Sequence, residues 1–538
     1  MVYQIYPRSF VDSDGNGVGD LRGIISKLDY LRWLGVDAIW ISPFYPSPGA
    51  DMGYDISDYT DVDPLFGDLQ AFDDLVAAAH TRGLRVIVDI VANHTSDEHA
   101  WFVESRSAKT NAKRDWYWWR PARAGYQPGT PGAEPNNWAS FFGGSAWSFD
   151  PETGEYYLHL FDRKQPDLNW ENPEVRQALF EMMRWWKNRG VDGLRLDVIN
   201  LVSKVPTLPG DDSGNGFKYY ACGPRIHKYM AELRAGVAGS DTDFVLIGET
   251  PGVNPEQAVG FTDQQRGELD MIFAFQHVEL GQENGKFDTR ALLPGELADM
   301  LAYWQESLGD AGWIGLYLSN HDQPRQVSRF GDDSEQWRAH SAKTLALASM
   351  LQRGTAFVYQ GEEIGMINAN FASASELRDV ESLNYLAQGG NLKGVQAAGR
   401  DNARTPMQWD SSPGAGFTAG TPWVAVPARG AHISVAEQRA AADSVLNFYR
   451  ALVELRHREP AIGSGSYRRV ATDTPAVYAY ERELGEQRLR IIANLSDETA
   501  HTTLSDCESW QELLATEPIA KQNPLVLPPW SGVVLQRS

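Results

Sequence analysis

Three carboxylates stand where strands of a sheet would end. Asp197, Glu249 and Asp322 each follow a short apolar run of the chain. One such carboxylate is readily explained by a salt bridge or a loop cap, but three that converge on one edge are what acid–base chemistry requires. Paired carboxylates in a cleft are the groups of glycoside hydrolysis: one attacks the sugar and the other protonates the leaving oxygen.

Basic side chains come from the same strand ends. Arg195 lies two residues before Asp197, hence on the same face of its strand, where it can hold Asp197 ionised and oriented. His94 and His321 follow two other apolar runs. A separation near 5 Å between the Asp197 and Glu249 carboxyl groups would give retention of configuration through a covalent glycosyl-enzyme.

The elements that carry these residues read as alternating strands and helices. Helical stretches lie around residues 69–82, which end at Gly83, and from Pro173 to Arg189. Eight strands with helices between them favour a parallel (β/α)₈ barrel over an open sheet. The expected strands are Val2–Tyr6, Ala38–Ile41, Val86–Ile90, Gly193–Leu196, Val245–Ile247, Met271–Phe275, Ile314–Leu318 and Ala356–Tyr359.

Two segments depart from this alternation. Residues 95–167, rich in Trp, Gly, Pro and Asn, are too long for an ordinary loop and predict an inserted domain beside the active face. Residues from about 360 to 430 form a second long excursion after the last strand. Beyond about residue 460 the pattern changes to strand-like runs with turn residues between them, which predicts a β-sandwich. These runs are Ala476–Glu481, Leu489–Leu495, Val526–Leu527 and Val533–Leu535. The predicted domains are therefore a barrel over 1–94 and 168–458, an insertion over 95–167 and a C-terminal domain over 459–538.

Composition excludes several classes of protein. The 538 residues hold 48 Lys+Arg and 71 Asp+Glu, a net charge of −23, so nucleic acid and anionic membranes are poor partners. No apolar run approaches the length of a membrane span, and no signal peptide is visible, which predicts a cytoplasmic protein, expected to be a monomer without an organic cofactor. Cys222 and Cys507 are too few for a disulfide framework.

Aromatic residues are numerous, with 18 Trp, 21 Tyr and 21 Phe. Most are expected in the core, including the run Trp116–Trp119 as the small core of the insertion. A minority can form stacking surfaces for the flat faces of sugar rings.

Six motifs resemble the conserved regions of the α-amylase family, glycoside hydrolase family 13. The resemblance covers the whole chain, and it implies a catalytic barrel, an insertion after its third strand and a C-terminal β-domain. The motif QPDLN is similar to that of the oligo-1,6-glucosidase subfamily. The motifs are Gly35–Pro43, Asp89–His94, Gln165–Asn169, Gly193–Asn200, Gly248–Thr250 and Ser319–Asp322.

The resemblance implies a role for each matching residue. Asp197 resembles the nucleophile, Glu249 the general acid/base, and Asp322 the third carboxylate that grips the ring hydroxyls. An ion pair between Asp51 and Arg404 would close the pocket and give exo action, releasing single glucose units. The residues implied to line the glucose subsite are Asp51, Tyr54, His94, Phe142, Arg195, His321 and Arg404.

Linkage preference depends on Val198, which resembles the residue typical of α-1,6-specific members. The resemblance therefore implies hydrolysis of α-1,6 bonds, with α-1,4 bonds and transfer to other acceptors left open. A trehalose-6-phosphate hydrolase is an alternative, for which Lys218 and Arg225 are the candidate phosphate-binding cations. A non-enzymatic relative would have lost the catalytic carboxylates, which are all present.

Oxygen ligands alternate with glycines in the segment from Asp12 to Asp20. Its side chains and the Val18 carbonyl can surround one Ca²⁺, and the resemblance also implies a structural metal here. A solvated acidic turn is the alternative. The candidate ligands are Asp12, Asp14, Asn16, Val18 and Asp20.

Overall fold

A closed barrel of eight parallel strands forms the centre of the molecule. The computed structural model describes residues 1–430, 432–504 and 507–537. The strands pair in the order β1-β11-β10-β9-β8-β7-β3-β2, so the predicted barrel is confirmed. Its strands are β1 (Val2–Ile5), β2 (Ala38–Ile41), β3 (Arg85–Val91), β7 (Gly193–Asp197), β8 (Val245–Glu249), β9 (Met271–Phe273), β10 (Ile314–Leu316) and β11 (Thr355–Tyr359).

Helices connect and cover these strands, and several begin at a side-chain cap. The carboxylates of Asp20 and Asp68 accept backbone N–H groups at the starts of α1 and α3, and Pro173 follows the cap Asn172 at the start of α5. The helices of the barrel are α1 (Leu21–Ser26), α2 (Leu28–Leu34), α3 (Leu69–Thr81), α5 (Pro173–Asn188), α6 (Phe217–Tyr220), α7 (Ile226–Leu233), α8 (Pro255–Thr262), α9 (Glu296–Leu308), α10 (Gln326–Phe330), α11 (Arg338–Met350), α12 (Val380–Ala387), α13 (Leu392–Ala398), α14 (Val435–Ala440), α15 (Val445–Arg458) and α16 (Pro460–Ser464).

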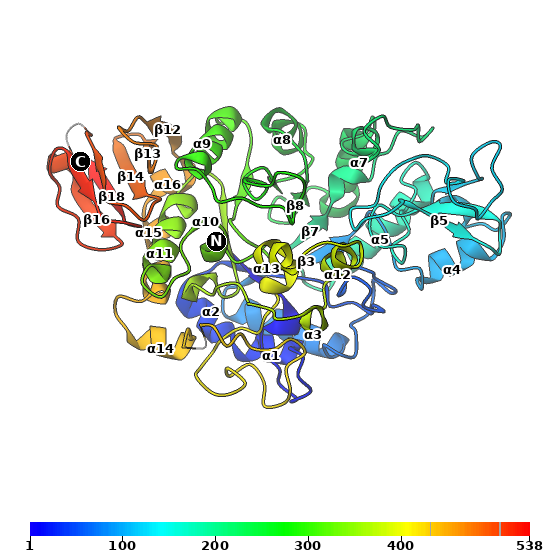
Figure 1. The fold of residues 1–538 in the computed structure, drawn as a ribbon, viewed down its shortest axis with the longest axis horizontal. Coiled ribbons are helices and arrows are strands. Elements are labelled where there is room, and N and C mark those ends of the chain that lie inside the picture. Colours follow the sequence, from blue (N-terminus) through cyan, green and yellow to red (C-terminus); the bar gives the residue numbers. More distant parts are fainter. Residues whose placement is uncertain (431, 505–506, 538) are drawn as a thin grey trace.

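The insertion after β3 lies at one end of the elongated molecule (Figure 1). It contains α4 (Ala100–Ser107) and an antiparallel sheet of β4 (Trp119–Arg120), β6 (Glu155–Leu158) and β5 (Trp147–Asp150). Trp118, Trp138 and Trp147 pack in its small core. Trp116, Tyr117 and Trp119 are buried as well, but they pack in the main core of the molecule, so only Trp118 of this run lies in the small core predicted for it.

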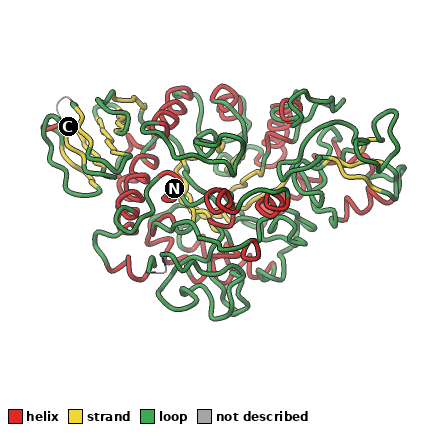
Figure 2. The backbone as a smooth tube through the Cα atoms, viewed as in Figure 1, coloured by secondary structure: helices red, strands yellow, loops and turns green. Residues whose placement is uncertain are grey.

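The C-terminal region lies at the opposite end, as the separate group of strands in Figure 2 shows. It is all-β, as predicted. Its larger sheet has the order β12-β13-β14-β18-β16, and β15 pairs with β17. The strands are β12 (Ser466–Val470), β13 (Val477–Leu484), β14 (Gln487–Asn494), β15 (Ala500–Thr502), β16 (Gln511–Ala515), β17 (Leu525–Leu527) and β18 (Gly532–Arg537).

Helix α11 joins the two regions, because it is buried on every side from Ser341 to Met350. One face packs on the barrel helices and the other on the C-terminal sheet. Thr344 Oγ1 donates to the Trp530 carbonyl at 2.6 Å, and the Tyr480 hydroxyl donates to the Ala348 carbonyl at 3.1 Å. The C-terminal sheet is therefore part of the shell around the barrel. None of the helices in the described residues is long and apolar enough to cross a membrane.

Candidate active site

One guanidinium joins the first two candidate carboxylates. Asp197 ends β7 and Glu249 ends the neighbouring strand β8. Arg195 Nη1 lies 2.6 Å from Asp197 Oδ1, and Arg195 Nη2 lies 2.6 Å from Glu249 Oε2. All three side chains are buried, so the charges interact through a medium far less polarisable than water.

Arg195 is itself held from behind by Asp89 on β3, at 2.8 Å. Asp89 also accepts the Trp40 indole N–H and the Tyr54 hydroxyl, at 3.2 and 3.0 Å. Burial raises the pKa of Asp89 to about 6 against the opposing charge of Arg195. Burial likewise raises the pKa of Asp197 well above its ordinary value, with Arg195 opposing and the negative charge of Glu249 adding to the rise. The positive charge of Arg195 therefore opposes the cost of burying both Asp89 and Asp197.

The third carboxylate, Asp322, lies in the loop after β10. Burial alone would raise its pKa, but the guanidinium charges of Arg400 and Arg404 hold the pKa of Asp322 well below its ordinary value. Arg404 Nη2 lies 2.7 Å from Asp322 Oδ1. Asp322 is therefore a permanent anion at the rim of the barrel.

His321 and His94 stay neutral in this surrounding. Burial lowers the pKa of His321 to about 3 and that of His94 to about 4. Gln4 Nε2 donates to His321 Nδ1 at 2.8 Å, which leaves the proton of this imidazole on Nε2. The Tyr54 ring stacks on His321, with centroids 5.2 Å apart and planes 9° apart.

These residues surround a cavity of about 340 Å³. Its lining includes the three carboxylates together with the predicted Asp51, Tyr54, His94, Phe142 and Val198. Phe161 lines it as well. Arg195, His321 and Arg404 lie behind the lining, where they hold the carboxylates and Tyr54 in place.

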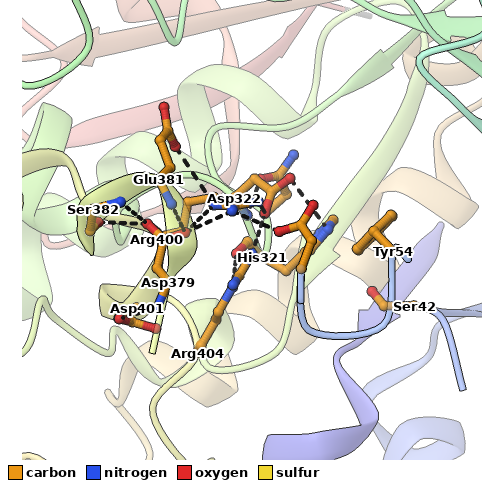
Figure 3. A network of polar contacts seen from close by, with 12 residues as sticks. Ser42, Tyr54, His321, Asp322, Asp379, Glu381, Ser382, Arg400, Asp401 and Arg404 are labelled. Atoms are coloured by element: carbon orange, nitrogen blue, oxygen red, sulfur yellow. Dashed lines mark hydrogen bonds and ion pairs between the residues drawn. The ribbon is translucent and has the colours of Figure 1, made fainter. Parts of the chain in front are cut away.

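The predicted ion pair between Asp51 and Arg404 is wrong. Arg400 takes this place, with Nη2 2.8 Å from Asp51 Oδ1, whereas Arg404 bonds to Asp322 and to the His321 carbonyl. Arg400 begins a short turn, while Arg404 lies after that turn and points toward His321 and Asp322 (Figure 3). Asp51 itself is fully buried, and burial raises its pKa to about 6 against the charges of Arg400 and Arg404.

Arg400 is the centre of a network that sequence reasoning missed. It also contacts Asp379 at 2.7 Å, Asp322 at 3.4 Å and Glu381 at 3.6 Å, and it lies 4.8 Å from the Phe142 ring centroid. Figure 3 shows Asp322, Asp379 and Glu381 around Arg400. The two motifs that carry them, RDVESLN and RDNARTPMQW, were visible in the sequence, but their juxtaposition was not.

Val198 has a backbone conformation that the sequence did not predict. Its φ of 36° is in the left-handed region, which a β-branched residue rarely adopts. This conformation directs the Val198 N–H to Glu249 Oε2, at 3.1 Å. The strained residue therefore connects the end of β7 to the acid on β8.

The predicted metal ligands gather in the loop between β1 and α1. Ligand oxygens of Asp12, Asp14 and Asp20 lie within 4.8 Å of one another. Asp12 and Asp20 are buried, and Thr418 Oγ1 donates to Asp12 at 2.5 Å. Asn16 accepts the Val18 N–H at 2.8 Å within the same loop. Three anionic oxygens at this spacing suit a hard divalent cation.

Comparisons with known proteins match nearly the whole chain. The family model described as "Alpha amylase, catalytic domain" matches residues 4–465, and "Alpha-amylase SusG C-terminal domain" matches residues 477–534. The chain is 48% identical over 522 residues to an oligo-1,6-glucosidase of Parageobacillus thermoglucosidasius, covering 94% of this chain and 91% of that protein.

Solved structures agree in the arrangement of the chain. A trehalose-6-phosphate hydrolase of Bacillus licheniformis is similar with a TM-score of 0.93 at 42% identity, covering 100% of this chain and 98% of the other. An isomaltulose synthase of Erwinia rhapontici is similar with a TM-score of 0.94 at 40% identity and the same coverage.

Proposed function

The chain belongs to the α-amylase family, glycoside hydrolase family 13, and we propose that it is an exo-acting, retaining α-glucosidase for α-1,6 bonds at the non-reducing end of short gluco-oligosaccharides. That it is a glycoside hydrolase follows from the family and its curated relatives. The observation that carries the mechanism is the Arg195 guanidinium shared by Asp197 and Glu249.

Because Arg195 binds both carboxylates, one oxygen of each carboxylate contacts the guanidinium and the other is available for the reaction. Glu249 Oε2 accepts from Arg195 and from the Val198 N–H, which leaves Oε1 to carry the proton for the leaving oxygen. Asp197 Oδ1 is occupied by Arg195, which leaves Oδ2 to attack the anomeric carbon. Carboxylates joined by one guanidinium favour the short separation of a retaining pair, about 5–5.5 Å.

The reaction then takes two displacements. Glu249 gives its proton to the glycosidic oxygen as the bond to the anomeric carbon breaks, and Asp197 forms an ester with that carbon. Glu249, now a carboxylate, takes a proton from water, whose oxygen displaces Asp197 and restores the original configuration. Asp322 and neutral His94 border the cavity that would hold the glucosyl ring.

Exo action is supported by the closed inner end of the cavity. Asp51 and Arg400 are both buried and paired there, which leaves no path for a second sugar beyond the non-reducing end. Gln165 Nε2 contacts Asp51 Oδ2 and His94 Nε2, each at 3.1 Å, and ties the insertion to this end.

The α-1,6 preference is supported by Val198 in the lining beside Glu249 and by the oligo-1,6-glucosidases among the relatives. Hydrolysis of α-1,4 bonds and transfer to sugar acceptors use the same machinery. The alternative of a trehalose-6-phosphate hydrolase is not favoured, because its candidate cations are already neutralised. Lys218 pairs with Asp211 at 2.6 Å, and Arg225 pairs with Glu171.

We also propose that Ca²⁺ binds the loop from Asp12 to Asp20. The ion would be held by carboxylates of Asp12, Asp14 and Asp20, with Asn16 and the Val18 carbonyl as further oxygen ligands. It would neutralise clustered anions in this loop, a structural role rather than a catalytic one. The cytoplasmic location and the monomeric state stay predictions.

A substrate panel tests the function. We expect kcat/KM for isomaltose to exceed those for maltose, sucrose and trehalose 6-phosphate, and NMR to show the α-anomer as the first product. Asp197→Ala and Glu249→Gln should lower kcat by several orders of magnitude while circular dichroism stays unchanged. Equal rates on maltose and isomaltose would remove the α-1,6 preference, and a β-anomer would remove the retaining mechanism.

A further inference from the structure

The lining of the catalytic cavity includes Glu279, a carboxylate that the mechanism does not use. Glu279 lies in the loop after β9, the strand that pairs with β8 at Glu249. A turn in which the N–H groups of Val278 and Glu279 donate to the Phe275 carbonyl brings these three residues into the wall of the cavity.

This wall lies on the leaving-group side of the cavity. The glycone end is closed by Asp51 and Arg400, so the leaving group must extend past Glu249, which protonates it. The residues beside Glu249 there are mostly apolar, namely Val198, Pro251, Phe275 and Val278. Glu249 and Glu279 both line this cavity.

No cation balances the charge of Glu279. Within the described part of the chain its carboxylate makes no hydrogen bond or ion pair. The side chain is exposed where it lines the cavity, and partial desolvation raises its pKa without an opposing positive charge. Among the described residues that line the cavity, the Lys and Arg side chains are Lys286 and Arg400. Lys286 pairs with Glu381 at 2.5 Å, and Arg400 is shared by several carboxylates.

We infer that Glu279 is a specificity determinant that makes this enzyme reject anionic leaving groups and accept neutral or cationic ones. The inference rests on the proposed α-glucosidase function and names the class of leaving group for that same cavity. A phosphorylated or carboxylated leaving group would place its charge against the unpaired, solvent-exposed carboxylate of Glu279 in the cavity wall, where like charges repel. A neutral sugar meets an apolar wall with one hydrogen-bond acceptor.

The test uses leaving groups that differ only in charge. The probes are α-glucosides of 4-carbamoylphenol, 4-carboxyphenol and 4-(aminomethyl)phenol, which are neutral, anionic and cationic at pH 7. The measured quantity is the ratio of kcat/KM for the carbamoyl compound to that for the carboxy compound, in the unaltered enzyme and in Glu279→Gln and Glu279→Lys. Glu283→Lys is the matched control, because Glu283 is on the same loop, changes the net charge equally and faces Arg290 at 3.8 Å instead of the cavity.

We expect a ratio of about 10 or more for the unaltered enzyme, a fall toward 1 in Glu279→Gln, and a change on the order of 100-fold in Glu279→Lys. Glu283→Lys should stay within about twofold, because an exposed charge outside the cavity is screened by salt. Equal ratios in all four proteins, or an equal change in Glu283→Lys, would overturn the inference. Isomaltose is assayed alongside: if the unaltered enzyme does not hydrolyse it, the proposed function fails, while the aryl glucosides still report on Glu279.

Discussion

The Arg195 guanidinium places both catalytic carboxylates, and its geometry is as important as its charge. Two nitrogens in one rigid plane each bind one carboxylate oxygen, while Asp89 holds Nη1 from behind. A lysine would offer a single ammonium that cannot reproduce this division of oxygens. The positions of both catalytic carboxylates therefore depend on the planar geometry of one guanidinium group.

Arg400→Lys should lower kcat/KM for isomaltose on the order of 100-fold, about 3 kcal/mol, mostly through KM. Lysine keeps the charge but cannot contact Asp51 and Asp379 together, so the glycone end loses its closure. Steady-state kinetics measure the effect. Arg378→Lys is the control, since its exposed guanidinium donates to backbone carbonyls; equal kinetics for both variants would contradict the role of Arg400.

The role of a single residue was predictable from the sequence where its motif contains only one side chain of the required type. Asp197, Glu249 and Asp322 each stand alone in their motifs, and the structure brings them to one cavity. The motif RDNARTPMQW has two arginines four residues apart, and spacing alone does not say which one faces Asp51. The short turn over residues 400–402 decides it, and such a turn has no signature in the sequence.

At the scale of elements, the end of β7 stores backbone strain at Val198. Val198→Gly should be more stable than Val198→Ala by about 1 kcal/mol, because only glycine adopts a positive φ without cost. Urea unfolding measures the difference. Val202, buried with a φ of −71°, is the matched control, and there the Ala variant should be the more stable one. The same order at both positions would show that Val198 is unstrained.

The loop between β1 and α1 should depend on Ca²⁺ for its stability. EDTA is expected to lower Tm by a few degrees, because removing an ion bound only by the folded state removes its binding free energy. Asp14→Asn should weaken this response, whereas Asp58→Asn, at another exposed loop aspartate, should leave it intact. A Tm that EDTA does not change would show that the loop is a solvated acidic turn.

Strands were predictable from the sequence where they are buried, because burial requires a run of apolar residues. All eight barrel strands coincide with apolar runs, because strands buried on both faces admit little else. In the C-terminal region β12, β15 and β16 were missed. The strand β12 (SYRRV) has no buried residue. In β16 (QELLA) two exposed residues are followed by three half-buried ones, so the alternation that predicts a strand is absent.

At the scale of the whole molecule, a buried glutamate should make stability depend on pH. Burial raises the pKa of Glu362 to about 8, although the Ser319 hydroxyl and the Tyr359 N–H donate to it. The folded state therefore binds this proton more tightly than the unfolded state. Its contribution is complete below pH 4.5 and is lost as pH rises through 8.

Glu362→Gln stays neutral at every pH and should gain stability over the unaltered enzyme between pH 5 and 9, by up to about 5 kcal/mol at the alkaline end. Thermal unfolding across this range measures the gain. Glu335→Gln, at an exposed position, should give a curve parallel to that of the unaltered enzyme. A parallel curve for Glu362→Gln would show that Glu362 is ionised in the folded state.

Helix α11, buried from Ser341 to Met350, has a consequence for synthesis of the chain on the ribosome. All three catalytic carboxylates emerge before this helix, but strands β14 and β18, which cover its outer face, are made last. Until they emerge, the nascent chain exposes an apolar helix that its barrel cannot cover. Protection by a chaperone, and the onset of activity, should therefore be timed by the emergence of β14 and β18 rather than by completion of the catalytic residues.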